Sequence, residues 1–224
     1  MKIIALIQAR MGSTRLPGKV IKEINGLPLI VHIYRRLLAC REVDETVVAV
    51  GLDNCPPLTD LCRKYGLKWE VGNESDLINR FSDICDYQQK SADAFVRITA
   101  DCLFHDPAYI DAMVKSYRDH YPKYRGLANW LPYRTISEGL DAEIYSTELL
   151  AQLDRDPKCP REGFATYAGE NGYLGAWPLM DQQRFPNGHD LHLSIDTPQD
   201  FERAEKMLKI LGNDEWRYEK TLEA

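Results

Sequence analysis

The sequence lacks any long uninterrupted hydrophobic run. None of its apolar stretches reaches the roughly 18–20 residues that a membrane-spanning helix needs. The apolar stretch at the amino terminus ends at Ile7 and is followed at once by polar residues, unlike a secretion signal. Low-complexity tracts, internal repeats and an obvious interdomain linker are also missing. We therefore expect a folded cytoplasmic protein that has no membrane partner.

An excess of positive charge is missing as well. The chain has 28 Lys and Arg against 34 Asp and Glu, a formal net charge of −6, and its pI is about 5.4. Because binding to duplex nucleic acid depends on clustered basic residues, we expect no nucleic-acid partner. With 44% hydrophobic residues, the 224-residue chain has enough apolar side chains for a core. We expect one domain spanning 1–224, less regular around 125–190.

No pair of cysteines has the Cys-x-x-Cys spacing of a metal or redox motif. We expect most of the six cysteines to be small buried hydrophobic residues in a reducing compartment. The histidines also show no ligand pattern. His189 and His192 are three residues apart, so on a strand they would point to opposite faces and would not share a metal ion.

Hydrophobic periodicity predicts alternating strands and helices in the first half of the chain. Continuous apolar runs, of the kind that buried parallel strands have, cover residues 2–8, 46–51 and 94–99. Helical spacing of apolar residues follows Pro28, covers 57–65, and begins again after two capping residues, Ser75 and Asp106. This alternation predicts an α/β fold of three layers, with a mostly parallel sheet covered by helices on both faces.

The second half gives weaker signals. In the first half, Asn25-Gly26 predicts a tight turn. In the second half, short strands are expected over 173–178 and 191–195. A last helix is expected from Pro198, with Thr197 and Asp200 forming a capping box.

The loop that leaves the first predicted strand carries the strongest functional signal. Within residues 8–19 it holds three cations, Arg10, Arg15 and Lys19, together with Gly12 and Gly18. Ligands of open α/β sheets lie at the carboxyl ends of the strands. Glycines let backbone amides approach oxyanions, and arginines fork two phosphate oxygens each. The loop is therefore predicted to wrap a polyphosphate; a surface loop with merely solvated cations is the alternative.

Known phosphate-binding loops do not account for this segment. Five residues separate Gly12 from Gly18, where a Walker P-loop has four, and Val20 follows the lysine in place of the magnesium-binding Ser or Thr. The loop also lacks the Gly-x-Gly-x-x-Gly pattern of dinucleotide-binding proteins. A phosphate loop of a third kind is required.

The loop 8–19, read QARMGSTRLPGK, closely resembles the signature of the sugar-acid cytidylyltransferases, the family of CMP-acylneuraminate and CMP-Kdo synthetases. The similarity is greatest to the branch of spore-coat polysaccharide biosynthesis cytidylyltransferases. Three more segments resemble family motifs in the same order: 72–80, 97–107 and 194–201. The resemblance implies a fold like that of nucleotide-diphospho-sugar transferases, which is Rossmann-like. It implies transfer of CMP from CTP to an acidic sugar with release of pyrophosphate, a need for Mg²⁺, and a homodimer.

The resemblance also implies roles for individual residues. It places CTP against residues of the loop, which are Gln8, Ala9, Arg10, Gly12, Ser13, Thr14, Arg15 and Lys19. Arg10 and Lys19 are the cations expected to matter most for the leaving pyrophosphate. Asp76 and Arg80 are candidates for reading cytosine, which the sequence does not assign.

Two aspartates are candidate magnesium ligands. Asp101 follows the strand predicted over 94–99, so it should emerge at the same sheet edge as the loop, and Mg²⁺ prefers a few carboxylates plus phosphates and water. Asp106 fills the nearby helix cap better, which leaves Asp101 available. Asp196 is likewise not needed by the capping box beside it. For both, the alternative is an aspartate with an ordinary local or solvent-facing role.

Weaker candidates belong to the acceptor side. The segment 139–143 resembles the one that follows the family's acceptor-binding loop and suggests Asp141 and Glu143. Glu162 and Thr166 resemble a Glu-His-Val-Thr stretch in which Gly163 replaces the histidine, and Leu103 stands where a proline is usual. Aromatic packing in the core or at a dimer contact is the expectation for three further side chains, Trp130, Tyr133 and Trp177.

Two other functions stay open. A nucleotide-sugar glycosyltransferase would have a similar sheet, and Asp141 with Glu143 imperfectly matches its acidic metal motif. A non-catalytic nucleotide-binding subunit is the second alternative, although a decayed enzyme need not keep two loop cations and two carboxylates.

Overall fold

The computed structural model describes residues 1–86, 91–131, 136–177, 191–215, 217 and 220–221. Its centre is a seven-stranded sheet with the order β5-β4-β1-β6-β8-β7-β9. The strands are β1 (Ile3–Ala9), β4 (Glu45–Gly51), β5 (Trp69–Gly72), β6 (Ala94–Thr99), β7 (Gly126–Ala128), β8 (Ala142–Ser146) and β9 (Gly175–Ala176). β8 runs antiparallel to both of its neighbours, and the other pairs are parallel.

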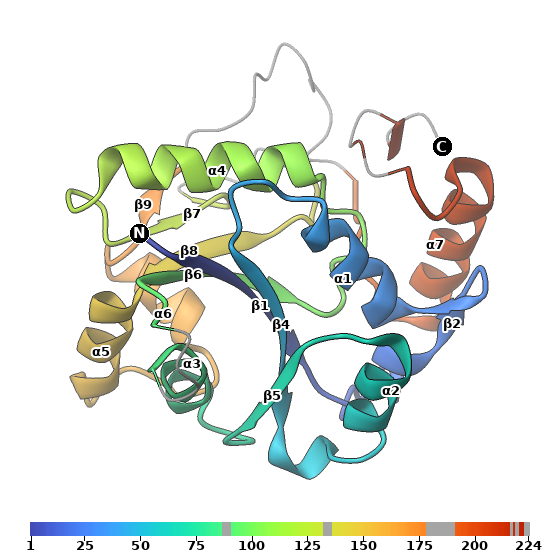
Figure 1. Ribbon diagram of the computed structural model, residues 1–224, viewed down its shortest axis with the longest axis horizontal. Helices are drawn as coiled ribbons and strands as arrows, with labels where there is room; N and C mark the ends of the chain where they lie inside the picture. Colours follow the sequence, from blue (N-terminus) through green and yellow to red (C-terminus); the bar gives the residue numbers. More distant parts are fainter. Residues whose placement is uncertain (87–90, 132–135, 178–190, 216, 218–219, 222–224) are drawn as a thin grey trace.

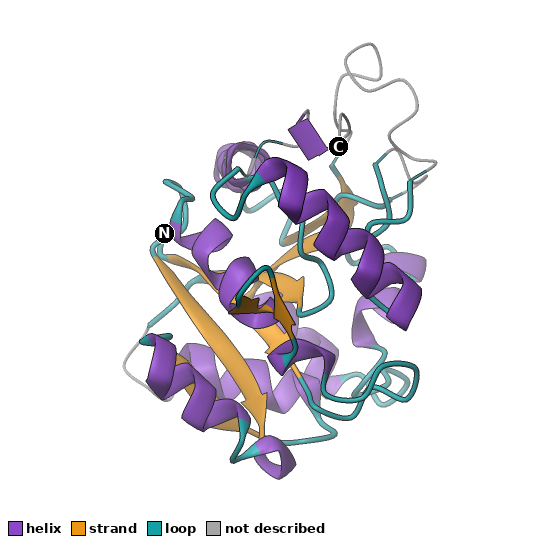
Figure 2. Ribbon diagram, turned by 90° about the vertical axis from the view of Figure 1, so that its right-hand side faces the viewer, coloured by secondary structure: helices purple, strands orange, loops and turns teal. Residues whose placement is uncertain are grey.

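Helices cover both faces of this sheet, as the sequence predicts (Figures 1 and 2). One face carries α1 (Leu29–Leu38), α2 (Leu58–Tyr65), α4 (Pro107–His120) and α7 (Pro198–Leu211). The other carries α3 (Leu77–Asp86), α5 (Thr147–Arg155) and α6 (Phe164–Glu170). Short elements complete the fold: 3-10 turns η1 (Lys19–Ile21) and η2 (Leu52–Asn54), and a hairpin of β2 (Glu23–Ile24) and β3 (Leu27–Pro28). The three-layer α/β prediction is confirmed.

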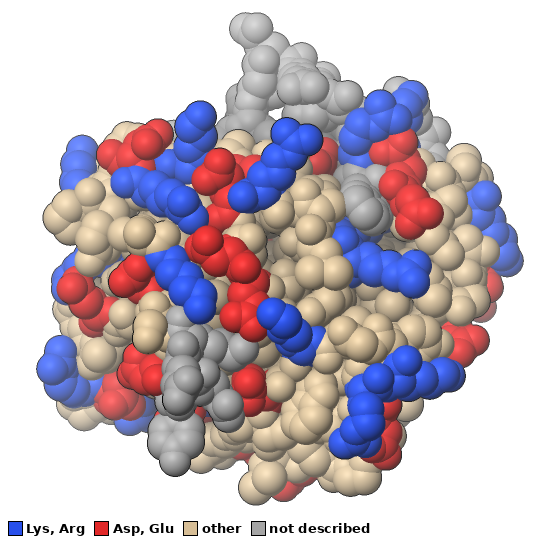
Figure 3. Space-filling view, viewed as in Figure 1, with Lys and Arg blue, Asp and Glu red and all other residues tan. Residues whose placement is uncertain are grey.

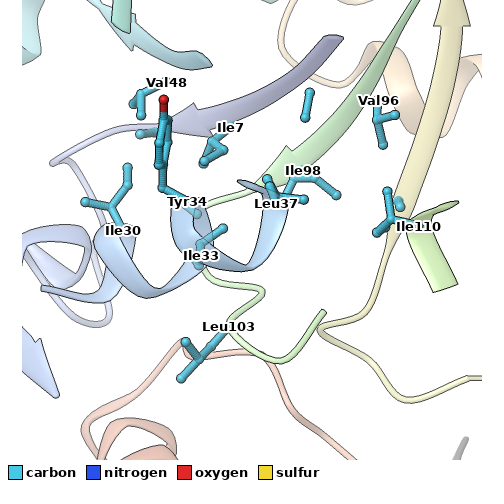
Figure 4. Close-up of a cluster of buried hydrophobic side chains, with 14 of the residues drawn as sticks. Ile7, Ile30, Ile33, Tyr34, Leu37, Val48, Val96, Ile98, Leu103 and Ile110 are labelled. Atoms are coloured by element: carbon cyan, nitrogen blue, oxygen red, sulfur yellow. The ribbon is translucent and has the colours of Figure 1, made fainter. Parts of the chain in front are cut away.

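Two hydrophobic clusters hold the layers together, and β1 contributes to both. Successive strand residues point to opposite faces. Ile7 and every second residue of β1 on its side therefore pack under α1 and α4, in the cluster drawn in Figure 4. Ile4 and Leu6 pack on the other side, against α3 and α5. Gln8 lies on that second face, just where β1 ends.

The predicted parallel strands and the helix caps of the first half are largely confirmed. β1, β4 and β6 match the predicted runs, and Gly66 ends α2 with a positive φ of 68°. Asn25 and Gly26 form the turn between β2 and β3. Asp106 caps α4 by accepting a hydrogen bond from the Ala108 amide.

The helix predicted after Pro28 is confirmed as α1, with Pro28 as its N-cap residue. The cap predicted for α3, Ser75, is wrong. The side chain that caps α3 is Asp76, which accepts from the Asn79 amide, because the Asn73 side chain already binds the amides of Ser75 and Asp76.

The predicted strands of the second half are shorter than expected. Within 173–178, only Gly175–Ala176 pairs as β9. Within 191–195, a single bridge joins His192 to Glu138. β5, α5 and α6 had no prediction, whereas β8 overlaps a stretch, residues 125–144, in which short extended pieces were expected. His189 and Tyr133 lie outside the described residues.

Cysteine and charge behave as ordinary features of this fold. All six cysteines are free thiols, and five of them are buried. Burial raises the pKa of Cys40, Cys62 and Cys85 to about 12.

Basic and acidic side chains are interspersed over the face shown in Figure 3. In the described part of the chain, every helix is too short or too polar to cross a membrane.

Candidate functional site

A cavity of about 670 Å³ opens at the carboxyl ends of β1 and β6. Four segments line it: the loop after β1, the end of β6, the residues before α6, and Asp196 before α7. In an open α/β sheet this edge is where ligands bind. Seven of the eight predicted loop residues line this cavity: Gln8, Arg10, Gly12, Ser13, Thr14, Arg15 and Lys19.

Lys19 joins the two candidate aspartates at this cavity. Its ammonium Nζ lies 2.9 Å from Asp101 Oδ2 and 3.0 Å from Asp196 Oδ1, and it also donates to the Ile195 carbonyl at 2.7 Å. Arg15 Nη2 lies 2.9 Å from the same Oδ1 of Asp196. We call Arg15, Lys19, Asp101 and Asp196 the lysine cluster. It brings together residues separated by up to 181 positions in the sequence, from Arg15 to Asp196.

The loop geometry explains why Lys19 is held so firmly. Gly18 adopts a φ of +66°, which other residues adopt only at a cost, and this turn starts η1 at Lys19. Leu16 and Val20 are buried on either side and anchor the loop in the core. The lysine side chain, 10% exposed, is therefore directed toward the aspartates. Gly12 differs, because a Cβ there would meet no atom within 4 Å.

Asp101 is held as a carboxylate. Burial by itself raises its pKa, but the Lys19 ammonium and the hydrogen bonds from Thr99 and Lys19 outweigh burial, so the pKa lies below its usual value. The side chain nevertheless remains 28% exposed, on the cavity side of the cluster. A charged carboxylate with partial access to the cavity is the form that binds a cation.

Asp196 is fixed by the segment around it. Ser194 Oγ donates to its Oδ2 at 3.2 Å. The predicted capping box is confirmed: the Thr197 side chain accepts from the Asp200 amide, and Asp200 Oδ2 accepts from the amides of Asp196 and Thr197. Because Asp200 satisfies these amides, the Asp196 carboxylate is free to face Lys19. Burial raises the pKa of Asp200, but its hydrogen bonds prevail and hold that pKa at about 2.

A second charged group lies on the sheet at the same cavity. Arg97 of β6 faces Glu143 of β8 in the antiparallel register, and Arg97 Nη1 donates to Glu143 Oε2 at 2.9 Å. Arg97 Nε donates to Gln8 Oε1, and Trp130 Nε1 donates to Glu143 Oε1, both at 2.9 Å. We call Gln8, Arg97, Trp130 and Glu143 the arginine cluster. Burial lowers the pKa of Arg97, but Glu143 outweighs burial and raises it above its usual value.

The rim of the cavity carries a third ion pair. Arg10 Nη1 lies 2.6 Å from Glu162 Oε1, and both side chains are more than half exposed. The structure thus brings Glu162 to the loop. Gly163, at the position where the resemblance expects a histidine, lines the cavity beside it. An exposed pair of this kind contributes little to stability and is easily opened by a ligand.

Four predicted site residues lie elsewhere among the described residues. Ala9 points into the core under α1, because it alternates with Gln8 along β1. Asp76 caps α3 and lies 3.6 Å from the Arg161 side chain. Arg80 is buried and donates to the carbonyls of Asn73 and Glu74, while Asp141 precedes β8 outside the cavity lining.

Arg80 has a structural task. A Cβ at Gly51 would lie 2.8 Å from its Nη2 and closer still to the Glu74 carboxylate, so Arg80 needs glycine at that position. Burial lowers its pKa. Arg80 thereby supports the ends of β4 and β5, on the side of the loop opposite to β6.

Glu143 is also not placed as a metal ligand. It is 5% exposed, and both of its carboxylate oxygens already accept hydrogen bonds from Arg97 and Trp130. The imperfect acidic motif of Asp141 and Glu143 is therefore not assembled as a metal site. Trp130 and Trp177 are partly buried against the two core clusters, as expected.

Asp101 and Asp196 suit a magnesium ion better. Their oxygens are hard ligands, and each carboxylate has one oxygen that Lys19 does not contact. The described residues contain no group of three or more His, Cys, Asp or Glu around one metal position. Two carboxylates, with substrate phosphates and water completing the shell, fit the way Mg²⁺ is usually bound.

Two residues of the site escaped sequence reasoning. The available signal for Arg97 was a lone charge inside an otherwise apolar strand, because a buried cation needs a partner. Ser194 gave no signal, because its role depends on the turn that faces it toward Asp196.

Comparison with known proteins agrees with this geometry. A model of the cytidylyltransferase family matches residues 4–221. An uncharacterized protein of Methanocaldococcus jannaschii is 29% identical over 206 residues, which cover 90% of this chain and 81% of that protein. The spore coat polysaccharide biosynthesis protein SpsF of Bacillus subtilis is 26% identical over 218 residues, covering 94% and 88%.

Solved structures extend the likeness to three dimensions. A cytidylyltransferase from Leptospira borgpetersenii superposes with a TM-score of 0.89 and 30% identity, over 100% of this chain and 93% of that chain. CMP:2-keto-3-deoxy-manno-octonic acid synthetase, complexed with CTP, shares the fold with a TM-score of 0.72 and 18% identity, over 94% and 99%. Since the family match spans nearly the whole chain, the chain belongs to the cytidylyltransferase family and is a nucleotidyltransferase.

Proposed function

We propose that this protein transfers CMP from CTP to a small acidic sugar, or to a related acid or phosphonate, and releases pyrophosphate. One observation carries the proposal: Lys19 holds Asp101 and Asp196 together at a cavity that the cationic loop lines. Cations for a triphosphate and carboxylates for a divalent ion thereby face the same space.

In this proposal the loop holds the triphosphate. Arg10, Arg15 and Lys19 supply charge along it, and Gly12 lines the cavity beside them. An oxygen of the acceptor attacks the α-phosphorus in line, the bond to the bridging oxygen breaks, and pyrophosphate leaves with that electron pair. The protein contributes mainly positioning and electrostatic stabilisation, as in phosphoryl transfer generally.

We propose Asp101 and Asp196 as the magnesium ligands. Bound Mg²⁺ would supply neutralisation of the charge that develops on the phosphate oxygens. Lys19 holds the two carboxylates close together until the nucleotide arrives. Arg15, which is 64% exposed, is free to leave Asp196 for a phosphate oxygen.

Three further parts of the proposal concern context. The name of the relative SpsF supports a role in surface polysaccharide or glycoconjugate biosynthesis. We also propose a cytoplasmic location and a homodimer, which sedimentation of the purified protein would test. No feature of the loop identifies the acceptor.

Glycosyl transfer from a preformed nucleotide sugar is the less favoured alternative, because Glu143 has both oxygens engaged within the protein. A screen separates the two. The protein is incubated with CTP and Mg²⁺ against acidic sugars and phosphonates, and pyrophosphate is measured; a second series offers nucleotide sugars without CTP.

Pyrophosphate release that depends on CTP, on an acid and on Mg²⁺ is the expected result. Consumption of a nucleotide sugar would contradict the proposal. Binding of CTP by calorimetry with no turnover on any acceptor would instead indicate a non-catalytic nucleotide-binding subunit.

A further inference from the structure

Arg97 is a buried cation that has a donor to spare. Its side chain is 13% exposed and lines the cavity. Nε is taken by Gln8 and Nη1 by Glu143, whereas Nη2 makes no hydrogen bond within the described part of the chain. Among the described residues, Nη2 is not one of the fully buried polar atoms that lack a partner, so it is open to the cavity. A ligand oxygen placed there would accept a charge-assisted hydrogen bond from it.

The arginine cluster holds this donor still. Gln8 and Glu143 grip the guanidinium from two neighbouring strands, and the Phe164 ring lies 5.7 Å from its central carbon. Glu143 is in turn fixed by Trp130. A planar guanidinium held in one orientation recognises a carboxylate or phosphonate better than a flexible ammonium does.

The position of Arg97 separates it from the triphosphate. The loop cations follow β1, while Arg97 is two residues before the end of β6, roughly 7 Å deeper along the strand. It also lies toward β8, away from the β4 and β5 edge that Arg80 supports. Asp101 emerges from the same strand. An acceptor reaching the α-phosphorus from this side would have its acidic group over Arg97.

We propose that Arg97 Nη2 binds the anionic group of the acceptor and makes the enzyme selective for acids over neutral sugars, with Glu143 and Trp130 as positioning residues. This inference rests on the proposed function. It names the residue that recognises the acid, which the loop motif leaves undetermined.

The test uses the full-length protein and three variants. Arg97→Lys keeps a positive charge beside Glu143 but loses the planar guanidinium, which can donate two parallel hydrogen bonds. The double variant Arg97→Gln/Glu143→Gln removes both charges, so no buried carboxylate is left unpaired. Arg36→Lys is the control, because Arg36 is also a buried arginine but bonds backbone carbonyls outside the cavity lining. Thermal melting checks that each variant is folded.

The readouts are the CTP dissociation constant from calorimetry, and kcat and KM for the acid that the screen identifies and for its methyl ester. We expect Arg97→Lys to raise KM for the acid about 10-fold and the double variant about 100-fold. The CTP dissociation constant should change less than threefold, the ester should be used poorly by every form, and Arg36→Lys should match the wild type.

Other results have separate meanings. If pyrophosphate is released with acids but KM for the acid does not change in the Arg97 variants, the inference is overturned and the proposed function stands. Weaker CTP binding in Arg97→Lys, with KM for the acid unchanged, would assign Arg97 to the nucleotide and overturn it as well. If the wild type uses the ester as well as the acid, acid selectivity is refuted. If no acceptor releases pyrophosphate, the proposed function fails, and the inference fails with it.

Discussion

The lysine cluster and the arginine cluster face one cavity but are built for different tasks. In the lysine cluster, one ammonium is shared by two carboxylates that are 28% and 16% exposed. In the arginine cluster, a single carboxylate is 5% exposed and accepts one hydrogen bond on each oxygen. The first set of contacts can be exchanged for a ligand's charges, whereas the second set is complete except for one nitrogen.

This difference follows from where the residues sit. Lys19, Asp101 and Asp196 lie at the ends of regular elements, and each carboxylate keeps one oxygen that Lys19 does not contact. Arg97 and Glu143 lie opposite each other within two paired strands, whose backbone is fixed by the ladder. Under the proposals above, the lysine cluster carries the reaction chemistry and the arginine cluster recognises the acceptor.

The largest effect is expected from removing the shared ammonium. Lys19→Met should lower kcat for pyrophosphate release about 100-fold or more, because a stabiliser of the leaving group is lost. Lys22→Met is the control, since Lys22 is exposed three residues later and does not line the cavity. Equal activity of the two variants would show that the lysine cluster is not the reaction centre.

A stability measurement tests the arginine cluster. Glu143→Gln leaves Arg97 buried without a counter-charge, so the free energy of unfolding should fall by about 3 kcal/mol in denaturant titration. Glu205→Gln, which breaks the exposed pair of Glu205 with Lys209, should cost less than about 1 kcal/mol. Similar losses for both variants would remove the distinction between a buried and an exposed pair.

The pH dependence of stability tests the role of Asp200, whose carboxylate accepts hydrogen bonds from the amides of Asp196 and Thr197. The pKa of Asp200 is about 2 in the folded protein, below the ordinary value of 3.8. Its contribution, roughly 2 kcal/mol, is fully present above about pH 4 and is lost as the pH falls toward 2.

Asp200→Asn should therefore be less stable than the wild type at pH 7 by that amount, with the gap closing in acid. Asp60→Asn, at an exposed aspartate, is the control and should leave the acid limb of the stability curve unchanged. A gap that stays constant down to pH 2 would contradict the assignment.

The smallest effect is expected at the rim above the lysine cluster. Gly12→Ala should change the free energy of unfolding by less than about 1 kcal/mol, since nothing lies within 4 Å of the new methyl group. CTP affinity should fall about fivefold if the loop amides approach the phosphates. Gly18→Ala should behave in the opposite way and lose stability, because φ there is +66°. Unchanged CTP affinity in Gly12→Ala would place the phosphates elsewhere.

The sequence predicted all four residues of the lysine cluster, and in the arginine cluster it predicted Gln8 and Glu143 as site residues but not Arg97. Asp101 follows a strand and Asp196 precedes a helix that periodicity or capping residues mark, and the loop that carries Lys19 leaves the first strand at the same sheet edge. Arg97 and Glu143 meet only because β8 inserts antiparallel beside β6. β8 is five residues long, buried on both faces, and its apolar pattern does not reveal its partner.

What the sequence determined alone is therefore local: the parallel strands β1, β4 and β6, the helices with clear caps, and a cationic loop at a strand end. Each follows from periodicity, propensity or spacing within a few residues of the chain. Only the tertiary structure decided which charges become partners. Pairing across β6 and β8 and the turn before α7 join residues 46 and 177 positions apart, and local signals do not extend over such separations.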